Sequence, residues 1–346
     1  MDLLLRGKPL FGELHLKYDD KTGLPAIVAL HNLKLGPGIG GCRCLPYTST
    51  DDAMRDVLRL ARGMTYKAAI SGLPHGGANA VIVRPADLPE SGARREAFFE
   101  AFGEFVDSLG GRYLVAEDAG TTPADMNAIR RCTPHVLGSE AGSGDPAPST
   151  AYGVRRGIEA AVKHRYGRDS LEGLHVAIQG LGAVGYRLAE ELHALGVRLT
   201  LTDTRSDRVE RAVAELGATA VAPDAIYAVE ADIFAPCALG SVLNDQTLPQ
   251  LKVDIVAGAA NNQLAEDRHG LLLQERGILY APDYALNAGG LINVASEFEG
   301  YDSVKSREHQ TRIYDTMLHI FERAALAKLP TNVIADRVVE ELLAAR

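Results

Sequence analysis

The stretch HVAIQGLGAVG, residues 175–185, decides the fold of the second half of this chain. An apolar run ends at Gln179 and leads into three glycines with the spacing G-x-G-x-x-G. Apolar residues then recur at helical spacing as far as Leu195, and a second apolar run ends at Asp203, 18 residues after Gly185. This order predicts a strand, a tight turn, a helix and a second strand, which together form the dinucleotide-binding fingerprint.

Each glycine of this motif has a physical role. Gly180 permits the tight turn, Gly182 lets the backbone approach a pyrophosphate, and Gly185 allows the helix to pack closely on the strand. The N-terminus of the helix offers unpaired N–H groups and the positive end of its dipole to phosphate oxygens. We therefore predict a pyrophosphate site at Gly180, Gly182, Ala183, Val184 and Gly185. The alternative is a glycine-rich turn that binds no ligand.

The carboxylate at the end of the second strand bears on the choice of cofactor. Asp203 would accept hydrogen bonds from the adenosine ribose and would repel a 2′-phosphate, so NAD is favoured over NADP. Arg205 lies close in sequence and weakens that preference. The alternative for Asp203 is a solvated carboxylate at a strand end.

Apolar runs and helical spacing alternate along most of the chain. In the second half, runs at 197–201, 233–235, 253–257 and 278–280 are separated by helical stretches, which predicts a parallel sheet covered on both faces. In the first half, 26–31, 81–83 and 113–115 are predicted strands. Residues 51–64 are a predicted helix with Thr50 as its N-cap.

With 346 residues, the chain is too long for one compact core, and two domains are expected. The Gly-, Pro- and Ser-rich stretch at 140–150 predicts the linker. The predicted fold class is therefore α/β, with a substrate and catalytic domain at 1–148 and a Rossmann-type, doubly wound domain at 149–327. Two last helical patterns, 307–326 and 333–345, lie on either side of Pro330, and we expect 328–346 to pack back on the first domain.

Composition excludes several functional classes. The net charge of −9 argues against a nucleic-acid surface, and the longest apolar runs are too short to cross a membrane. The three leucines within 1–8 are too few for a signal peptide. The four cysteines lack the paired spacing of a zinc site, so we predict no metal, small buried thiols and a cytoplasmic location.

Seven ordered stretches carry a family resemblance. They are LGPGIGG (35–41), ARGMTYKAA (61–69), AEDAGTTPADM (116–126), the glycine motif (180–185), DIFAPCALG (232–240), NNQLAEDRHG (261–270) and APDYALNAGGLINVA (281–295). Together they resemble the leucine, valine and phenylalanine dehydrogenases of the wider glutamate dehydrogenase group, with the leucine dehydrogenases nearest. The resemblance runs from about residue 17 to about residue 340.

The resemblance implies reversible oxidative deamination of an apolar L-amino acid to a 2-oxo acid and ammonia, with hydride passing to NAD, in a homo-oligomer. It implies that Lys67 binds the substrate carboxylate and that Asp118 handles protons at the amino group. Without the resemblance, a solvated lysine and a turn aspartate are the alternatives. It further assigns Asn262 to the substrate and cofactor, Gly40, Gly41, Met64 and Leu291 to the side-chain pocket, and Thr150 and Asn287 to the nicotinamide.

The match fails at one catalytic position. Where the family has Gly-Gly-Gly-Lys, this chain has Gly76-Gly77-Ala78-Asn79. An asparagine donates and accepts hydrogen bonds but cannot act as a general acid or base, a contribution of about 10²–10⁴-fold. Ala78 would cost about 1–2 kcal/mol if its position required a positive φ. His75 is a candidate replacement that titrates near neutral pH, and a loop histidine without that role is its alternative.

Two hypotheses follow. The first is an active NAD-dependent amino-acid dehydrogenase, or a variant that reduces imines, in which Asn79 slows the hydration steps more than hydride transfer. The second is a catalytically silent NAD-binding protein of the same fold.

Overall fold

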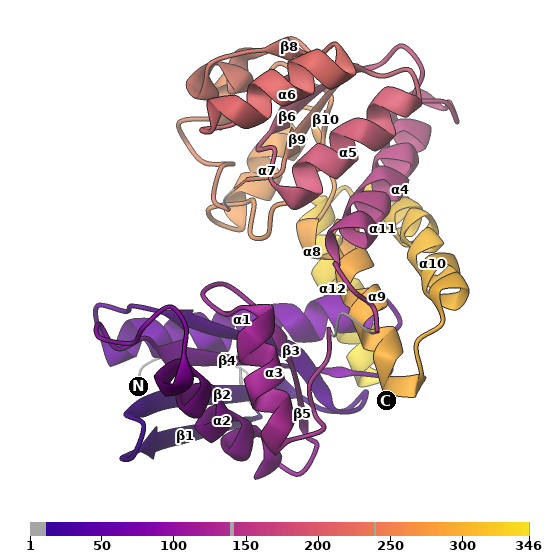
Figure 1. The fold of residues 1–346 in the computed structure, drawn as a ribbon. Helices are drawn as coiled ribbons and strands as arrows, with labels where there is room; N and C mark the ends of the chain where they lie inside the picture. Colours follow the sequence, from indigo (N-terminus) through magenta and orange to yellow (C-terminus); the bar gives the residue numbers. More distant parts are fainter. Residues whose placement is uncertain (1–11, 139–141, 239, 346) are drawn as a thin grey trace. The chain divides into compact units, whose positions relative to one another are not determined.

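The computed structural model describes residues 12–138, 142–238 and 240–345, which form two compact units (Figure 1). The first unit contains the residues up to Gly144, Val294–Tyr301 and the residues from Leu342 onward. The second contains Asp145–Asn293 and Asp302–Glu341. The domain limits expected from the sequence stay a prediction. Part of the expected linker, 140–141, and the apolar N-terminal stretch at 1–8 lie outside the described residues.

The first unit is built on a five-stranded mixed sheet with the order β1-β2-β4-β3-β5. β1 and β2 are antiparallel, as are β2 and β4, whereas β3 pairs in parallel with β4 and β5. The strands are β1 Glu13–Asp19, β2 Leu24–Asn32, β3 Gly38–Leu45, β4 Gly76–Val83 and β5 Tyr113–Glu117, and the helices are α1 Thr50–Ile70, α2 Ala93–Asp107 and α3 Pro123–Cys132.

Strand alternation divides the core of this unit between two faces of the sheet. Val81 of β4 packs with Ile27 of β2 and with Val57 of α1. Ala80 and its alternating neighbours on β4 instead join a cluster that includes phenylalanines of α2 and residues of α3. Odd-numbered β4 residues, Asn79 among them, therefore share the face covered by α1.

Two local expectations are corrected here. Ser49, not Thr50, caps α1, because its side chain accepts a hydrogen bond from the backbone N–H of Asp52 at 3.1 Å. Ala78 lies inside β4 and is not among the residues with positive φ, so the strain considered for it does not arise.

The second unit contains a fully parallel six-stranded sheet with the order β11-β10-β9-β6-β7-β8. Its strands are β6 His175–Gln179, β7 Arg198–Thr202, β8 Thr219–Ala220, β9 Ile233–Pro236, β10 Ile255–Val256 and β11 Leu279–Tyr280. The strand order reverses beside β6, and ligands of such sheets bind at this switch point, beyond the carboxyl ends of the strands. The predicted doubly wound fold is confirmed.

The helices of this part of the chain are α4 Ala147–Tyr166, α5 Ala183–Ala194, α6 Ser206–Leu216, α7 Arg268–Glu275, α8 Asp283–Leu286, α9 Gly289–Ala295, α10 Ser303–Thr311, α11 Ile313–Ala327 and α12 Thr331–Ala344. The end of the expected linker is instead the first turn of α4. The helix expected over 307–326 is divided into α10 and α11 at Arg312, and α12 begins directly after Pro330, which cannot continue a helix.

Two other features are absent from the part of the chain that the structure describes. No helix there is long and apolar enough to cross a membrane. No group of three or more His, Cys, Asp or Glu side chains is placed there to hold a metal ion. Cys42 and Cys44 are buried free thiols, as expected, whereas Cys132 and Cys237 are partly exposed.

Candidate functional site

The first unit brings together four of the predicted site residues, from three different strands or strand ends. A Cβ atom added to Gly40 would lie 2.8 Å from Oδ1 of Asn79 and only 1.7 Å from the carbonyl oxygen of Ala78. A Cβ added to Gly41 would lie 2.6 Å from Cβ of Asp118. The two glycines are thus required by the close approach of Asn79 and Asp118.

Asn79 is 2% exposed, and it points to the face of the sheet that α1 covers. Its amide nitrogen donates one long hydrogen bond, 3.5 Å, to the carbonyl of Ala80. Among the described residues, this is the one hydrogen bond that the side chain of Asn79 forms.

Helix α1 lies directly against the glycines that precede Asn79. A Cβ added to Gly77 would lie 2.0 Å from the backbone nitrogen of Thr65. Met64 and Lys67 flank Thr65 on this helix, and both side chains are half-buried. Helix α1 carries Lys67 and strand β4 carries Asn79. The close contact between α1 and β4 therefore brings the two sequence motifs together.

Asp118 follows β5 immediately, and a turn holds it. Its backbone N–H donates to Oγ1 of Thr121 at 3.0 Å. Its Oδ1 accepts from the N–H of Ala119 at 2.6 Å and from the guanidinium of Arg43 at 3.4 Å.

The sequence analysis missed Arg43, although its position two residues after Gly41 on β3 puts it on the same face of the sheet. The guanidinium also forms an ion pair with Asp56 of α1 at 3.0 Å. Burial acts to lower the pKa of Arg43, but Asp118 and Asp56 outweigh it, so that the pKa is raised. The hydroxyl of Tyr47 donates to Asp56 at 2.7 Å, and burial together with this carboxylate raises the pKa of Tyr47.

His75, the candidate replacement for a lysine at position 79, is 1% exposed. Its ring packs edge-on against Phe298, with ring centres 5.2 Å apart. This packing favours the alternative of a core histidine.

In the second unit, the glycine motif has the geometry of a phosphate cradle. Gly180 has φ +96°, and a Cβ there would lie 2.7 Å from Ala238. A Cβ on Gly185 would lie 2.0 Å from the carbonyl oxygen of Gly180, which shows how closely α5 packs on β6. At Gly182 an added Cβ meets nothing within 4 Å. Space therefore exists at the N-terminus of α5, where Ala183 is exposed and Val184 half-buried.

Asp203 is held at the edge of this cradle. Its carboxylate accepts from the N–H groups of Leu181 at 2.6 Å and Arg205 at 2.9 Å. Burial acts to raise the pKa of Asp203, but these N–H donors and Arg208 outweigh it and lower the pKa. The guanidinium of Arg208 lies 3.6 Å from the carboxylate, whereas that of Arg205 pairs with Asp207. Arg208 is a second charged neighbour that the sequence analysis missed.

Several buried polar atoms of the second unit have no hydrogen-bond partner among the described residues, and they include Oε1 of Gln179, Oγ1 of Thr202 and Oδ1 of Asn287. Gln179 and Thr202 end β6 and β7, and the amide nitrogen of Asn287 donates to Ala259 at 3.0 Å and Asn261 at 2.8 Å. Buried polar groups are normally satisfied, so each of these atoms is available to accept a hydrogen bond from a ligand. They fit a dinucleotide. Gln179 and Thr202 could have been proposed from the sequence, because each is a polar residue at the carboxyl end of an apolar strand.

The remaining predicted residues lie in the same unit. Oγ1 of Thr150 donates to Pro146 at 3.0 Å, and a Cβ on Gly290 would lie 2.4 Å from it, so the start of α4 packs against the start of α9. Leu291, next on α9, is half-buried. Asn262 is exposed and has φ +51°.

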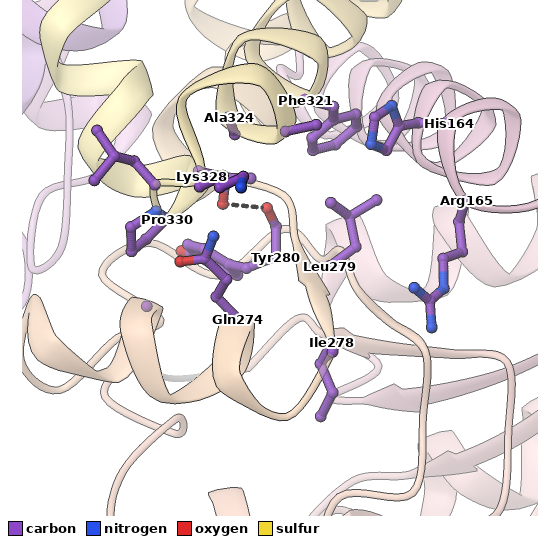
Figure 2. A pocket seen from close by; sticks show the side chains of 15 residues that line it. His164, Arg165, Gln274, Ile278, Leu279, Tyr280, Phe321, Ala324, Lys328 and Pro330 are labelled. Carbon is purple, nitrogen blue, oxygen red and sulfur yellow. Dashed lines mark hydrogen bonds between the residues drawn. The ribbon is translucent and has the colours of Figure 1, made fainter.

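A separate cavity of about 360 Å³ lies at the ends of α4, α7 and α11 beside β11 (Figure 2). His164, Gln274, Tyr280 and Lys328 are among its lining residues, and Oγ1 of Thr331 donates to the carbonyl of Tyr280 at 2.6 Å. None of the predicted cofactor residues lines it, so it is distinct from the cradle at α5.

Two family models match almost the entire chain. One, described as Glu/Leu/Phe/Val dehydrogenase, dimerisation domain, matches residues 11–135. The other, Glutamate/Leucine/Phenylalanine/Valine dehydrogenase, matches 141–207 and 198–332. The chain belongs to the Glu/Leu/Phe/Val dehydrogenase family. The predicted family is therefore confirmed, and with it the class of enzyme, an oxidoreductase of the amino-acid dehydrogenase type.

Relatives within the family agree with this assignment. The leucine dehydrogenase of Geobacillus stearothermophilus is 51% identical over 93% of this chain and 88% of its own length. The L-tryptophan dehydrogenase of Nostoc punctiforme is 46% identical over 92% of this chain and 89% of its own. The crystal structure of a tryptophan dehydrogenase from that organism has a TM-score of 0.86 at 42% identity, covering 97% of this chain and 96% of the other.

A hetero-hexameric glutamate dehydrogenase from Thermus thermophilus has a TM-score of 0.78 at 23% identity, covering 96% of this chain and 89% of the other. At that identity the likeness concerns the fold alone. The glutamate dehydrogenase thus shares the α/β fold of this chain.

Proposed function

We propose that this chain is an NAD-dependent dehydrogenase that catalyses the reversible oxidative deamination of an apolar L-amino acid to a 2-oxo acid and ammonia. The observation that carries the proposal is the grouping of Asn79 and Asp118 around Gly40 and Gly41. These residues come from separate sequence motifs, and the sheet places Asn79 against Gly40 and Asp118 against the adjacent Gly41.

The substrate assignment rests on the chemistry of the predicted residues. Lys67 would bind the carboxylate that all amino acids share, since a lysine ammonium is a compact cation. Gly40, Gly41, Met64 and Leu291 bring no charge to the side chain of the substrate, which favours an aliphatic or aromatic group. Relatives named leucine, tryptophan and phenylalanine dehydrogenase are consistent with this class.

The cofactor assignment rests on Asp203. A bound nicotinamide dinucleotide would supply the hydride acceptor, with its pyrophosphate at Gly182 and the N-terminus of α5. The buried carboxylate of Asp203 disfavours a 2′-phosphate, and Arg205 and Arg208 are both engaged by carboxylates. Oδ1 of Asn287 and Thr150 are the proposed neighbours of the nicotinamide, with Asn262 contacting cofactor and substrate.

Asp118 is the proposed group that moves protons at the substrate nitrogen, because it is the carboxylate of the group around the two glycines. Asn79 would hold the substrate carbonyl, or the attacking water, by hydrogen bonds without exchanging a proton. Hydride transfer depends mainly on geometry, whereas addition and loss of water depend on proton transfer. We therefore expect reduction of a preformed imine to be less affected by Asn79 than deamination.

One observation favours a second candidate. Because Asn79 cannot titrate, a catalytically silent NAD-binding protein of the same fold remains the alternative.

The test is a screen of NAD and NADP reduction across L-amino acids, with reverse reactions on 2-oxo acids plus ammonia or amines. We expect turnover with apolar amino acids, a preference for NAD, and loss of turnover in Asp118→Asn. Binding of NADH without turnover of any substrate would instead favour the silent protein, and no binding of either dinucleotide would contradict both.

We also propose a homo-oligomer that works in the cytoplasm. The matched dimerisation domain favours assembly, and the four free cysteines suit a reducing compartment. Light scattering on the purified protein would show a monomer if the first part of this proposal is wrong.

A further inference from the structure

Arg43 occupies a place beside Asp118 that the proposed reaction does not yet explain. We infer that Arg43 is a positioning residue that fixes the Asp118 carboxylate, so that Oδ1 is held by the protein and Oδ2 faces the substrate. This inference rests on the proposed function and adds to it the atom that exchanges the proton.

The register of the sheet brings the two side chains together. In the parallel pairing of β3 with β5, Gly41 lies opposite Ala116 and Cys42 opposite Glu117. Arg43 is the next residue of β3, and Asp118 is the first residue after β5. The pairing is therefore a consequence of the backbone, because a one-residue slip would turn Arg43 to the other face of the sheet.

The hydrogen bonds distinguish the two carboxylate oxygens. Among the described residues, two groups donate hydrogen bonds to this carboxylate, and Oδ1 accepts both. The donors are the N–H of Ala119 at 2.6 Å and Nη2 of Arg43 at 3.4 Å. Oδ2 instead lies over Gly41, where an added Cβ would be 3.1 Å away. The absence of a side chain at Gly41 leaves space beside Oδ2.

A second set of contacts holds the guanidinium itself. Nη1 of Arg43 donates to both oxygens of Asp56, at 3.0 and 3.4 Å, and Tyr47 donates to the same carboxylate. Asp56 belongs to α1, the helix that also carries Lys67. The planar guanidinium thus has one nitrogen fixed to α1 and the other directed at Asp118, which a lysine ammonium could not reproduce.

The charge of Arg43 matters because Asn79 has none. The charge of Asp118 acts on Arg43 and Cys42 of β3, on Tyr113 of β5 and on Tyr47, and that of Asp56 acts on Arg43 and Tyr47. Of these, only Arg43 is a cation. Nε of Arg43 is buried without a hydrogen-bond partner among the described residues, which costs stability and is not expected of an arginine retained for folding alone.

The experiment compares Arg43→Ala and Arg43→Lys with Arg84→Ala. Arg84 is a matched control, because it lies in the same unit, its side chain is 26% exposed against 24% for Arg43, and it too forms an ion pair, with Glu90 at 2.6 Å. We expect Arg43→Ala to lower kcat about 10- to 100-fold while leaving the KM for NAD within about twofold, since misplaced reacting groups lose rate at this scale. Arg43→Lys should lose less, and Arg84→Ala should keep wild-type kcat.

Two further readouts separate positioning from a structural role. Millimolar guanidinium chloride should restore part of kcat in Arg43→Ala but not raise it in the wild type. A crystal structure of Arg43→Ala, or of Arg43→Lys if the alanine variant does not fold, should show the Asp118 carboxylate rotated relative to the wild-type crystal structure.

Wild-type kcat in folded Arg43→Ala would overturn the inference, as would an unchanged Asp118 carboxylate in the crystal. Absence of turnover in the wild type would contradict the proposed function instead. The crystallographic comparison would then still decide whether Arg43 orients Asp118.

Discussion

At the scale of single residues, Asn79 makes the sharpest prediction. It is 2% exposed and lies against Gly40, within the same group as Asp118. Asn79→Lys introduces a titratable amine into this group, so we expect the rate of oxidative deamination to rise by about 10- to 100-fold, the lower part of the range for general acid–base catalysis. Reduction of a preformed imine should change by only a few-fold.

Asn79→Met is the matched control for Asn79→Lys, because a methionine side chain is similar in length to a lysine side chain but carries no charge. Both rates are measured by NADH formation or consumption under saturating substrate, together with melting temperatures. Equal deamination rates in the lysine and methionine variants would show that acid–base chemistry at this position does not limit the reaction.

Residues such as Asn79, Lys67 and Asp118 could be found in the sequence because each stands inside a recognisable motif. Arg43 and Arg208 could not, because their partners are set by strand register and by where a helix packs. Arg43 meets Asp118 from 75 positions away. Arg205 illustrates the same limit: proximity in sequence suggested that its guanidinium would sit near Asp203, yet it pairs with Asp207 and leaves Asp203 to Arg208.

At the scale of elements, two glycines at the turn between β6 and α5 are expected to have different roles, one in cofactor binding and the other in stability. Gly182 has φ −67° and open space around an added Cβ, so alanine fits there without strain. Gly185 has no such space. Gly182→Ala should therefore leave the melting temperature of the unliganded protein nearly unchanged but weaken NADH binding at least about tenfold, because the methyl group occupies the path of the pyrophosphate.

Gly185→Ala is the contrasting variant, expected to destabilise the protein by about 1–3 kcal/mol through overpacking. Calorimetric titration with NADH and thermal unfolding measure the two effects. Undiminished NADH affinity in Gly182→Ala would place the pyrophosphate elsewhere.

Most elements could be predicted because apolar periodicity and turn residues are local signals. Their ends were less certain. Ser49 and Thr50 are both good N-caps, and only the observed hydrogen bond from Asp52 distinguishes them. The division of the expected final long helix at Arg312 leaves no mark in the spacing of apolar residues, so periodicity could not reveal it.

At the scale of the whole molecule, the order of the two units could be predicted, because the glycine motif stands between a strand and a helix, with an acidic residue 18 positions after it, in the second half of the chain. The return of Val294–Tyr301 to the first unit could not be predicted. A return of the chain end was expected over 328–346, but only the residues from Leu342 onward belong to the first unit, because Asp302–Glu341 belong to the second. No change of composition marks these crossings, since they are set by tertiary packing. A molecule of two units also has no single free energy of unfolding, so stability is best measured within one unit.

Stability against acid should depend on His31 in the first unit. Its Nδ1 lies 2.8 Å from Oγ1 of Thr65, which joins β2 to α1. Burial, with a contribution from Arg62, lowers the pKa of His31 to about 4 from its ordinary value of 6.5. Between these two pH values the unfolded chain binds a proton that the folded chain does not, so stability falls as the pH falls from about 6.5 to about 4. The full loss is roughly 3 kcal/mol.

His31→Gln and His31→Asn remove this titration, so both should flatten the pH dependence of unfolding over that window by the same amount. Samples equilibrated in urea at each pH, followed by a brief hydrogen-exchange pulse at one fixed pH, report unfolding of the β2 segment specifically. Parallel curves for the wild type and both variants would mean that His31 is not the proton-linked group, and that acid sensitivity of this unit has its origin in another side chain.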